Sequence, residues 1–198
     1  MTLALLDHLG IDRACVLGIS YGGEVALRFA IGHPQRVERL MLFNTTARTG
    51  PWLGDIGDAW NLASGDADAY YLTTIPVIYS PAFYREKQEW MAKRRETLRP
   101  VFGDPNFIQP MIRLTNSARG YDVTDRLGEI QAPTLIVSCQ QDYLTPVEEQ
   151  QLLHQRIPNS HYVVIPGSGH ASMYEQPMLF AALALGFCNT SKAEYNIT

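Results

Sequence analysis

The segment that most constrains the fold is 14–31, where an apolar run meets a glycine-rich turn and then a helical pattern. Residues 14–18 (ACVLG) indicate a short buried strand, and residues 24–31 (EVALRFAI) indicate a helix. Between them lies the sequence Gly18-Ile-Ser-Tyr-Gly22, and Gly23 extends this patch of small residues. We expect a sharp, strained turn here, with glycines beside the serine because side chains would collide at those positions.

Apolar runs elsewhere continue the alternation of strands and helices. The predicted strands are 14–18, 40–43, 134–139 and 161–165, and the predicted helices in the same parts of the chain are 2–9, 24–31, 147–156 and 178–187. Because crossover helices separate consecutive strands, the strands should run parallel. The fold class predicted is therefore α/β, with a mostly parallel sheet of about four strands flanked by helices.

The middle of the chain differs in composition from both ends. From about residue 48 to residue 121, aromatic residues accumulate among prolines and glycines without a strand alternation. These aromatic residues are Trp52, Trp60, Tyr70, Tyr71, Tyr79, Phe83, Tyr84, Trp90, Phe102 and Phe107. We expect a helical insertion over 48–121, which divides the α/β core into 1–47 and 122–198.

Charge and hydropathy exclude several classes of partner. The 198 residues carry a formal net charge of -4, which argues against nucleic acid or an anionic membrane surface. No apolar run approaches the roughly 20 residues of a membrane-spanning helix, and the first residues lack the basic and small-residue features of a signal peptide. We therefore expect a cytoplasmic protein without a membrane span, acting on a small molecule.

The cysteines and histidines show no metal-ligand spacing. Cys15, Cys139 and Cys188 are far apart in the sequence, and we expect free buried thiols. A nucleotide-binding fingerprint is also missing, so no metal and no cofactor are predicted.

Three polar residues follow predicted strands in a way that indicates nucleophilic catalysis. Ser20 follows the strand at 14–18, and a serine nucleophile needs a histidine base and an orienting carboxylate. Asp142 follows the strand at 134–139, and His170 follows 161–165 through a short loop. Since the carboxyl ends of parallel strands share one edge of a sheet, we expect Ser20, Asp142 and His170 to meet there.

Each of these signals has an ordinary structural alternative. A glycine-serine pattern also occurs as a plain turn, and taken singly Asp142 would be an ordinary turn aspartate. The other histidines lie in predicted helices or beside a strand, where structural or solvated roles suffice; they are His8, His33, His154 and His161. The combined order of serine, aspartate and histidine favours the catalytic interpretation. The backbone N–H of Tyr21, at the start of a helix, is a candidate oxyanion donor.

Two blocks of the sequence resemble the α/β-hydrolase family, over residues 2–47 and 122–190. The matching segments are Leu5 to Ile11, Gly18 to Gly23, His33 to Val37, Leu40 to Leu42, Ala132 to Val137, Asp142 with Pro146, Ile157 to Ser160 and Gly167 to His170.

The resemblance implies Ser20 as nucleophile, His170 as general base, Asp142 as the orienting acid and the Tyr21 N–H as one oxyanion donor. It also implies that 48–121 forms the variable cap over the active site, with aromatic side chains in a substrate pocket or in the cap's own core.

The chain departs from this family at its beginning. Members of the family have several strands before the first helix of this sequence, and a loop there supplies the second oxyanion donor. The strand before Ser20 should therefore lie at an exposed edge of the sheet. We expect either a homo-oligomer that covers this edge or a chain that is a fragment of a longer protein.

The leading functional hypothesis is a carboxylic ester hydrolase that forms an acyl-enzyme on Ser20. Residues 42–50 are similar to the corresponding segment of enol-lactone hydrolases, so lactone hydrolysis is an alternative, as are acyl transfer and carbon–carbon bond cleavage with the same triad. A noncatalytic binding or assembly module is the alternative from another class.

Overall fold

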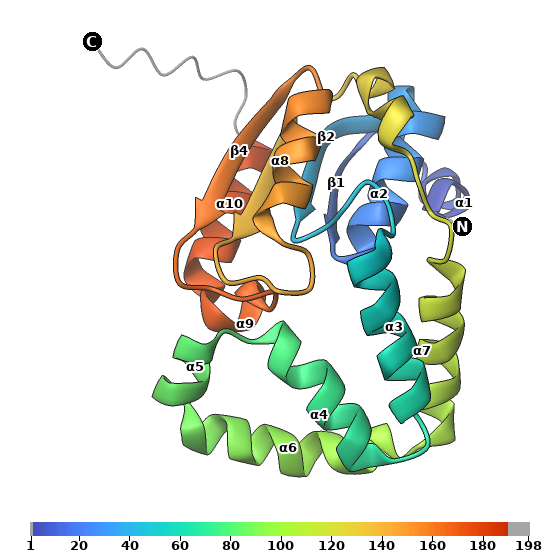
Figure 1. Cartoon of the computed structure of the whole chain (residues 1–198). Coiled ribbons are helices and arrows are strands. Elements are labelled where there is room, and N and C mark those ends of the chain that lie inside the picture. Colours follow the sequence, from blue (N-terminus) through green and yellow to red (C-terminus); the bar gives the residue numbers. More distant parts are fainter. Residues whose placement is uncertain (1, 190–198) are drawn as a thin grey trace.

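The computed structural model describes residues 2–189, and within them four strands form one parallel sheet (Figure 1). The strands are β1 (Ala14–Ile19), β2 (Val37–Phe43), β3 (Thr134–Cys139) and β4 (Ser160–Ile165), and they lie side by side in this order. The structure confirms the predicted α/β class. Strand β2 begins three residues earlier than predicted, because Glu38 and Arg39 interrupt the apolar pattern of a strand whose first half is partly exposed.

Helices of two groups accompany the sheet. The elements that alternate with the strands are α1 (Thr2–His8), α2 (Tyr21–Gly32), η1 (Pro34–Arg36), η2 (Thr124–Glu129), α8 (Val147–Arg156), α9 (Ser172–Glu175) and α10 (Pro177–Asn189). The helices between β2 and β3 are α3 (Pro51–Ala63), α4 (Ala67–Ile78), α5 (Pro81–Glu86), α6 (Gln88–Phe102) and α7 (Pro105–Ser117). Helix α2 begins directly after Ser20, three residues before the predicted start at Glu24, because two glycines obscured its first turn.

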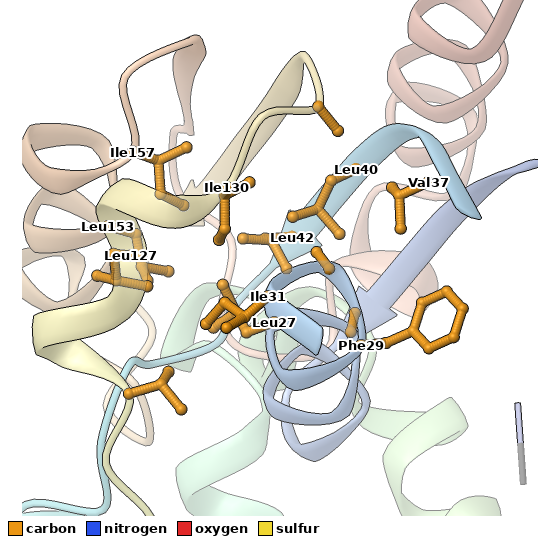
Figure 2. Close-up of a cluster of buried hydrophobic side chains, with 14 of the residues drawn as sticks. Leu27, Phe29, Ile31, Val37, Leu40, Leu42, Leu127, Ile130, Leu153 and Ile157 are labelled. Carbon is orange, nitrogen blue, oxygen red and sulfur yellow. The ribbon is translucent and has the colours of Figure 1, made fainter. Parts of the chain in front are cut away.

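The central strands β2 and β3 are buried on both faces of the sheet, which explains why their sequences are rich in apolar residues. Along β2, Leu40 and Leu42 point to one face, and Met41 and Phe43 point to the other. On the first face, Leu40 and Leu42 pack against side chains of α2, η2 and α8 (Figure 2). The labelled side chains from those helices and their ends are Leu27, Phe29, Ile31, Leu127, Ile130, Leu153 and Ile157.

Helix α10 covers the opposite face of the sheet. Phe180 and Phe187 of α10 pack against the second cluster, and the Phe180 ring lies 4.7 Å from the Phe43 ring. Among the cysteines, all three are free thiols as predicted, but only Cys139 is fully buried. The expectation of burial was wrong for Cys15 and Cys188, which are half-buried because they lie where the edge strand β1 meets the end of α10.

Helices α3–α7 lie beyond the carboxyl ends of the strands (Figure 1). Their starts follow from local sequence signals: Asp66, Ser80 and Asp104 cap α4, α5 and α7 by accepting a hydrogen bond from a backbone N–H two or three residues later. Most of the aromatic residues in this segment pack with one another rather than against the sheet. The fully buried ones are Tyr70, Tyr71, Tyr79 and Phe102.

Strand β1 lies at the edge of the sheet, as the sequence predicts. Within residues 2–189 it pairs only with β2, and the Leu17 side chain on it is 37% exposed. The homo-oligomer expected to cover this edge stays a prediction. No helix in the same part of the chain is long and apolar enough to cross a membrane.

The packing of α2 on the sheet predicts a large cost for truncating Leu27, which is fully buried. We expect Leu27→Ala to lower the free energy of unfolding by about 2–5 kcal/mol, because the substitution removes apolar contacts and leaves a cavity. Urea denaturation measures this loss. The matched control is Leu62→Ala in α3, where the side chain is 87% exposed, and it should change the same quantity by less than about 0.5 kcal/mol. Equal effects of the two substitutions would contradict the placement of α2.

Candidate active site

Ser20 occupies a strained turn between β1 and α2. Its backbone has φ 53° and ψ -126°, a conformation that residues other than glycine rarely adopt. Two hydrogen bonds hold it: Ser20 N–H donates to Phe43 O at 3.0 Å, and Thr45 Oγ1 donates to Ser20 O at 2.7 Å. Both partners belong to the end of β2 and the loop after it, so the neighbouring strand fixes the position of the serine.

Close packing around this turn requires glycine at positions 18 and 23, whereas the sequence analysis expected it at positions 18 and 22. A Cβ atom on Gly18 would lie 2.3 Å from Gly22 O, and one on Gly23 would lie 2.5 Å from the Thr45 side chain. At Gly22 a Cβ atom would meet no atom within 4 Å. The expectation that glycine at position 22 avoids a collision was therefore wrong, since the tight contact falls on Gly23 instead.

Asp142 and His170 form a buried hydrogen-bonded pair. His170 Nδ1 lies 2.8 Å from Asp142 Oδ2, and both side chains are almost completely buried. Asp142 lies in the loop after β3 and His170 in the loop after β4, which brings them together at the carboxyl edge of the sheet. In this arrangement the carboxylate fixes the orientation of the imidazole ring and leaves its second nitrogen for other partners.

The Asp142 carboxylate has further donors on both oxygens. Oδ1 accepts from Leu144 N–H and Thr145 N–H, each at 2.9 Å, and Oδ2 accepts from Asn44 Nδ2 and Thr145 Oγ1, each at 2.8 Å. Burial raises the pKa of Asp142, but the charge and hydrogen bond of His170, with those from Asn44 and Thr145, outweigh burial and lower it. The carboxylate is therefore held in its ionised form.

The sequence analysis missed Asn44 and Thr145 as members of this site. Asn44 directly follows β2, is fully buried and has a left-handed backbone with φ 48°. The rule that selected Asp142 and His170, polar residues at strand ends, also selects Asn44. For Thr145 the available signal was its place three residues after an aspartate, where side-chain-to-backbone turns are common.

A cavity of about 100 Å³ lies beside Ser20 and beside Thr145, which contacts the Asp142–His170 pair. Ser20 and Thr145 both line it, and Thr145 Oγ1 lies 3.4 Å from His170 Nδ1. Side chains from α3, α7 and the loop after Asp142 form its apolar wall; they are Leu53, Trp60, Leu114, Ala118 and Leu144. Of the ten aromatic residues expected either in a pocket or in a separate core, Trp60 lines this cavity.

Ser20 and His170 are not hydrogen-bonded to each other in the part of the chain that the structure describes. The structure brings Asp142 into contact with His170 and places Ser20 at the same edge, beside the cavity. Hydrogen bonds from a nucleophile to its base are often long before substrate binds.

Tyr21 is the first residue of α2, so its N–H belongs to the helix N-terminus, where backbone donors lack intrahelical acceptors. Its side chain reaches the other group of helices, with Tyr21 Oη 2.9 Å from Ser117 Oγ of α7.

The loop that carries His170 is fastened to the segment between α4 and α5. Glu175 accepts hydrogen bonds from Ser80 N–H at 2.6 Å, from Ser80 Oγ at 2.8 Å and from Gly169 N–H at 2.9 Å. A Cβ atom on Gly169 would lie 2.6 Å from Ser80 N, so only glycine fits there. Glu175 was another residue that the sequence analysis did not select.

Glu24 is a second buried carboxylate at this site. It lies one turn beyond Ser20 on α2, is 6% exposed and lines the same cavity. Burial raises its pKa to about 7, and the charge of Arg28 opposes that shift only in part. Within residues 2–189, no group of three or more His, Cys, Asp or Glu side chains is arranged to hold a metal ion.

Comparisons with known proteins agree with this architecture. Residues 1–177 match the family described as "alpha/beta hydrolase fold". The chain is 49% identical to MGS-M2, described as an alpha/beta hydrolase enzyme from a Medee basin deep-sea metagenome library. The match covers 99% of this chain and 72% of that one, with a TM-score of 0.96.

Two more distant relatives carry names that mention a substrate. Est816, described as an N-acyl homoserine lactone degrading enzyme, is 29% identical, with a TM-score of 0.77 over 94% of this chain and 71% of that one. The "Putative carbamate hydrolase RutD" of Caulobacter sp. (strain K31) is 26% identical over 197 residues, which cover 96% of this chain and 70% of the relative.

The geometry of the turn predicts that its glycines differ in tolerance. Gly18→Ala should lower the free energy of unfolding by about 1–3 kcal/mol or more, because the new methyl group meets backbone atoms that cannot move aside. Gly22→Ala, with open space at its Cβ position in α2, should be neutral or stabilise the fold by up to about 1 kcal/mol. Thermal unfolding of the two variants makes the comparison, and a loss of stability at position 22 as large as that at position 18 would contradict this account.

Proposed function

Because the chain belongs to the α/β-hydrolase fold family, we propose that it is a serine hydrolase that cleaves carboxylic esters through an acyl-enzyme on Ser20. The observation that carries the proposal is the buried Asp142–His170 hydrogen bond of 2.8 Å at the sheet edge where the strained Ser20 lies. Asparagine, threonine and two backbone groups saturate the same carboxylate. Such an arrangement supports a role in orienting an imidazole base.

In the proposed reaction, His170 accepts the proton of Ser20 Oγ as this oxygen attacks the ester carbonyl. The Tyr21 N–H, at the N-terminus of α2, donates to the developing oxyanion. When the tetrahedral intermediate collapses, His170 returns the proton to the leaving alcohol. Water then enters, and His170 activates it to release the acid. Asp142 stays ionised throughout and stabilises the protonated imidazole.

We propose further that helices α3–α7 serve as the cap predicted over 48–121. Leu53 and Trp60 of α3 and Leu114 of α7 contribute the apolar wall of the cavity beside Ser20. A wall of this kind suits the hydrocarbon part of a small ester, while Ser20, Glu24 and Thr145 supply polar groups to the same cavity.

Lactone hydrolysis is the second candidate, because a lactone is a cyclic ester that the same groups can open. The 29% identity to a lactone-degrading enzyme and the resemblance of residues 42–50 to enol-lactone hydrolases support it. Acyl transfer uses the same intermediate with an alcohol in place of water, and carbon–carbon bond cleavage uses the same three residues. A noncatalytic binding module is less well supported, since binding alone needs no saturated carboxylate behind a histidine.

Hydrolysis of p-nitrophenyl butanoate and of N-butanoyl homoserine lactone tests the proposal. We expect wild-type protein to cleave at least one of them, and Ser20→Ala to lower kcat by at least about 10³-fold because the acyl-enzyme cannot form. The control is Ser64→Ala, which alters a serine that does not line the cavity beside Ser20 and should leave kcat within about twofold of the wild-type value.

Residual activity in Ser20→Ala close to that of the wild type would contradict the assignment of the nucleophile. The rates at which the wild type hydrolyses the two substrates separate the two candidate functions: faster opening of the lactone than of the linear ester favours the lactonase.

A further inference from the structure

The proposed mechanism leaves one buried charge of the cavity without a role. Glu24 is 94% buried and lines both the cavity beside Ser20 and an adjoining cavity of about 150 Å³, which Tyr21 and Arg28 also line. In the described part of the chain its carboxylate makes no hydrogen bond and no ion pair within 4 Å. A buried carboxylate that faces a cavity without a partner needs an explanation.

The other charged groups around Glu24 have partners of their own. Across the cavity, Arg119 pairs with Asp58 of α3. Arg28, one turn further along α2, lies with its guanidinium carbon 5.1 Å from the centre of the Tyr121 ring. The positive charge of Arg28 attracts Glu24, but the guanidinium forms no ion pair with its carboxylate. In the described part of the chain no cation therefore contacts the Glu24 oxygens, which leaves them open to a charged donor that enters the cavity.

Keeping an unpaired carboxylate here lowers the stability of the fold. The raised pKa of Glu24 shows that the folded chain favours its neutral form. A glutamine of the same shape would avoid the cost. Groups held in such unfavourable states concentrate at functional sites, where a ligand supplies the missing partner.

We propose that Glu24 binds a cationic amino group on the acyl part of the substrate, so that Ser20 acts preferentially on small aminoacyl esters. This inference rests on the proposed function of Ser20. An ammonium group would complete the pairing of the carboxylate, and the apolar wall would contact the methylene groups between the ammonium and the ester carbonyl.

The spacing on α2 limits the length of that acyl chain. Glu24 N–H donates to Ser20 O at 3.3 Å, so the two residues lie one helical turn apart, and their side chains can engage a carbonyl and an ammonium separated by only a few bonds. The small volume of the cavity, about 100 Å³, sets the same limit. A β-alanyl ester has this length.

The test compares β-alanine ethyl ester with ethyl butanoate, which differ only in the exchange of the terminal ammonium for a methyl group. In the wild type, kcat/KM should be higher for the amino ester. Glu24→Gln should lower kcat/KM for the amino ester by about 10–100-fold, the range of a charge-assisted hydrogen bond, and change that for ethyl butanoate by less than about threefold. An equal loss for both esters, or no change in their ratio, would overturn the proposal.

The pH dependence of the preference for the amino ester provides a second readout. Since Glu24 is ionised above its pKa of about 7 and neutral below it, the preference for the amino ester should weaken as pH falls from 8 to 6. Burial of Glu24 and the opposing charge of Arg28 set this range, and the other titratable or charged groups that face Glu24 are Tyr121 and the Asp58–Arg119 pair. A preference that stays constant over this interval in the wild type would count against Glu24 as its source.

Thermal unfolding separates this role from a structural one. Because the pKa of Glu24 is raised on folding, its ionisation destabilises the fold fully above about pH 7 and hardly below pH 4.5. Glu24→Gln should therefore raise the Tm by a few degrees at pH 8 and by much less at pH 5. A lower Tm for this variant at pH 8 would reveal a structural partner for the carboxylate and overturn the proposal.

Binding distinguishes a failure of this inference from a failure of the proposed function. If the wild type cleaves none of the esters and lactones tested, the assignment of Ser20 fails, but calorimetry with β-alanine ethyl ester on Ser20→Ala protein still tests Glu24. Binding that disappears when Glu24→Gln is added supports the amino-group site. Binding of equal strength in both proteins, or no binding to either, rules the site out.

Discussion

The hydrogen bond between Asp142 and His170 is the interaction on which the rest of this site depends. A carboxylate that is almost fully buried is tolerated only where hydrogen-bond partners satisfy both oxygens, and here the partners come from the segments after three different strands. Asn44 approaches from the end of β2, and Thr145 from the loop that carries Asp142 itself. The need to satisfy one charge therefore joins the carboxyl ends of β2, β3 and β4 into a single rigid edge.

The same edge fixes the serine and the helices beyond it. Thr45, next to Asn44, holds the carbonyl of Ser20 and packs against Gly23, so the loop after β2 positions the serine as well as the carboxylate. On the other side, Glu175 fastens Gly169, and with it the His170 loop, to Ser80. The cavity thus lies between two groups of elements that touch through specific hydrogen bonds, and its walls combine apolar side chains with the unpaired Glu24.

Sequence alone predicted the fold because the central strands are buried on both faces, which makes runs such as 134–139 mostly apolar and easy to recognise. It also predicted Ser20, Asp142 and His170 as candidates, since each follows a strand and parallel strands share one edge. It missed Asn44 and Thr145, although each had a local signal: Asn44 follows a strand and Thr145 lies three residues after Asp142. It also missed Glu24 and Glu175. The contacts of Glu175 join residues far apart in the sequence, and the state of Glu24 depends on burial, and no local pattern encodes those properties. The role of Gly22 was misjudged because the close contact of Gly23 with Thr45 is set by the neighbouring strand.

Covalent trapping of the serine tests the central claim most directly. Protein treated with a fluorophosphonate and digested with trypsin would be analysed by mass spectrometry, because this reagent reacts with serines activated by an adjacent base. The account predicts a single adduct on the peptide that contains Ser20, and no adduct in a Ser20→Ala variant that unfolds at a similar temperature. A folded wild-type protein without the adduct, or with the adduct on another serine, would contradict the claim that His170 and Asp142 activate Ser20.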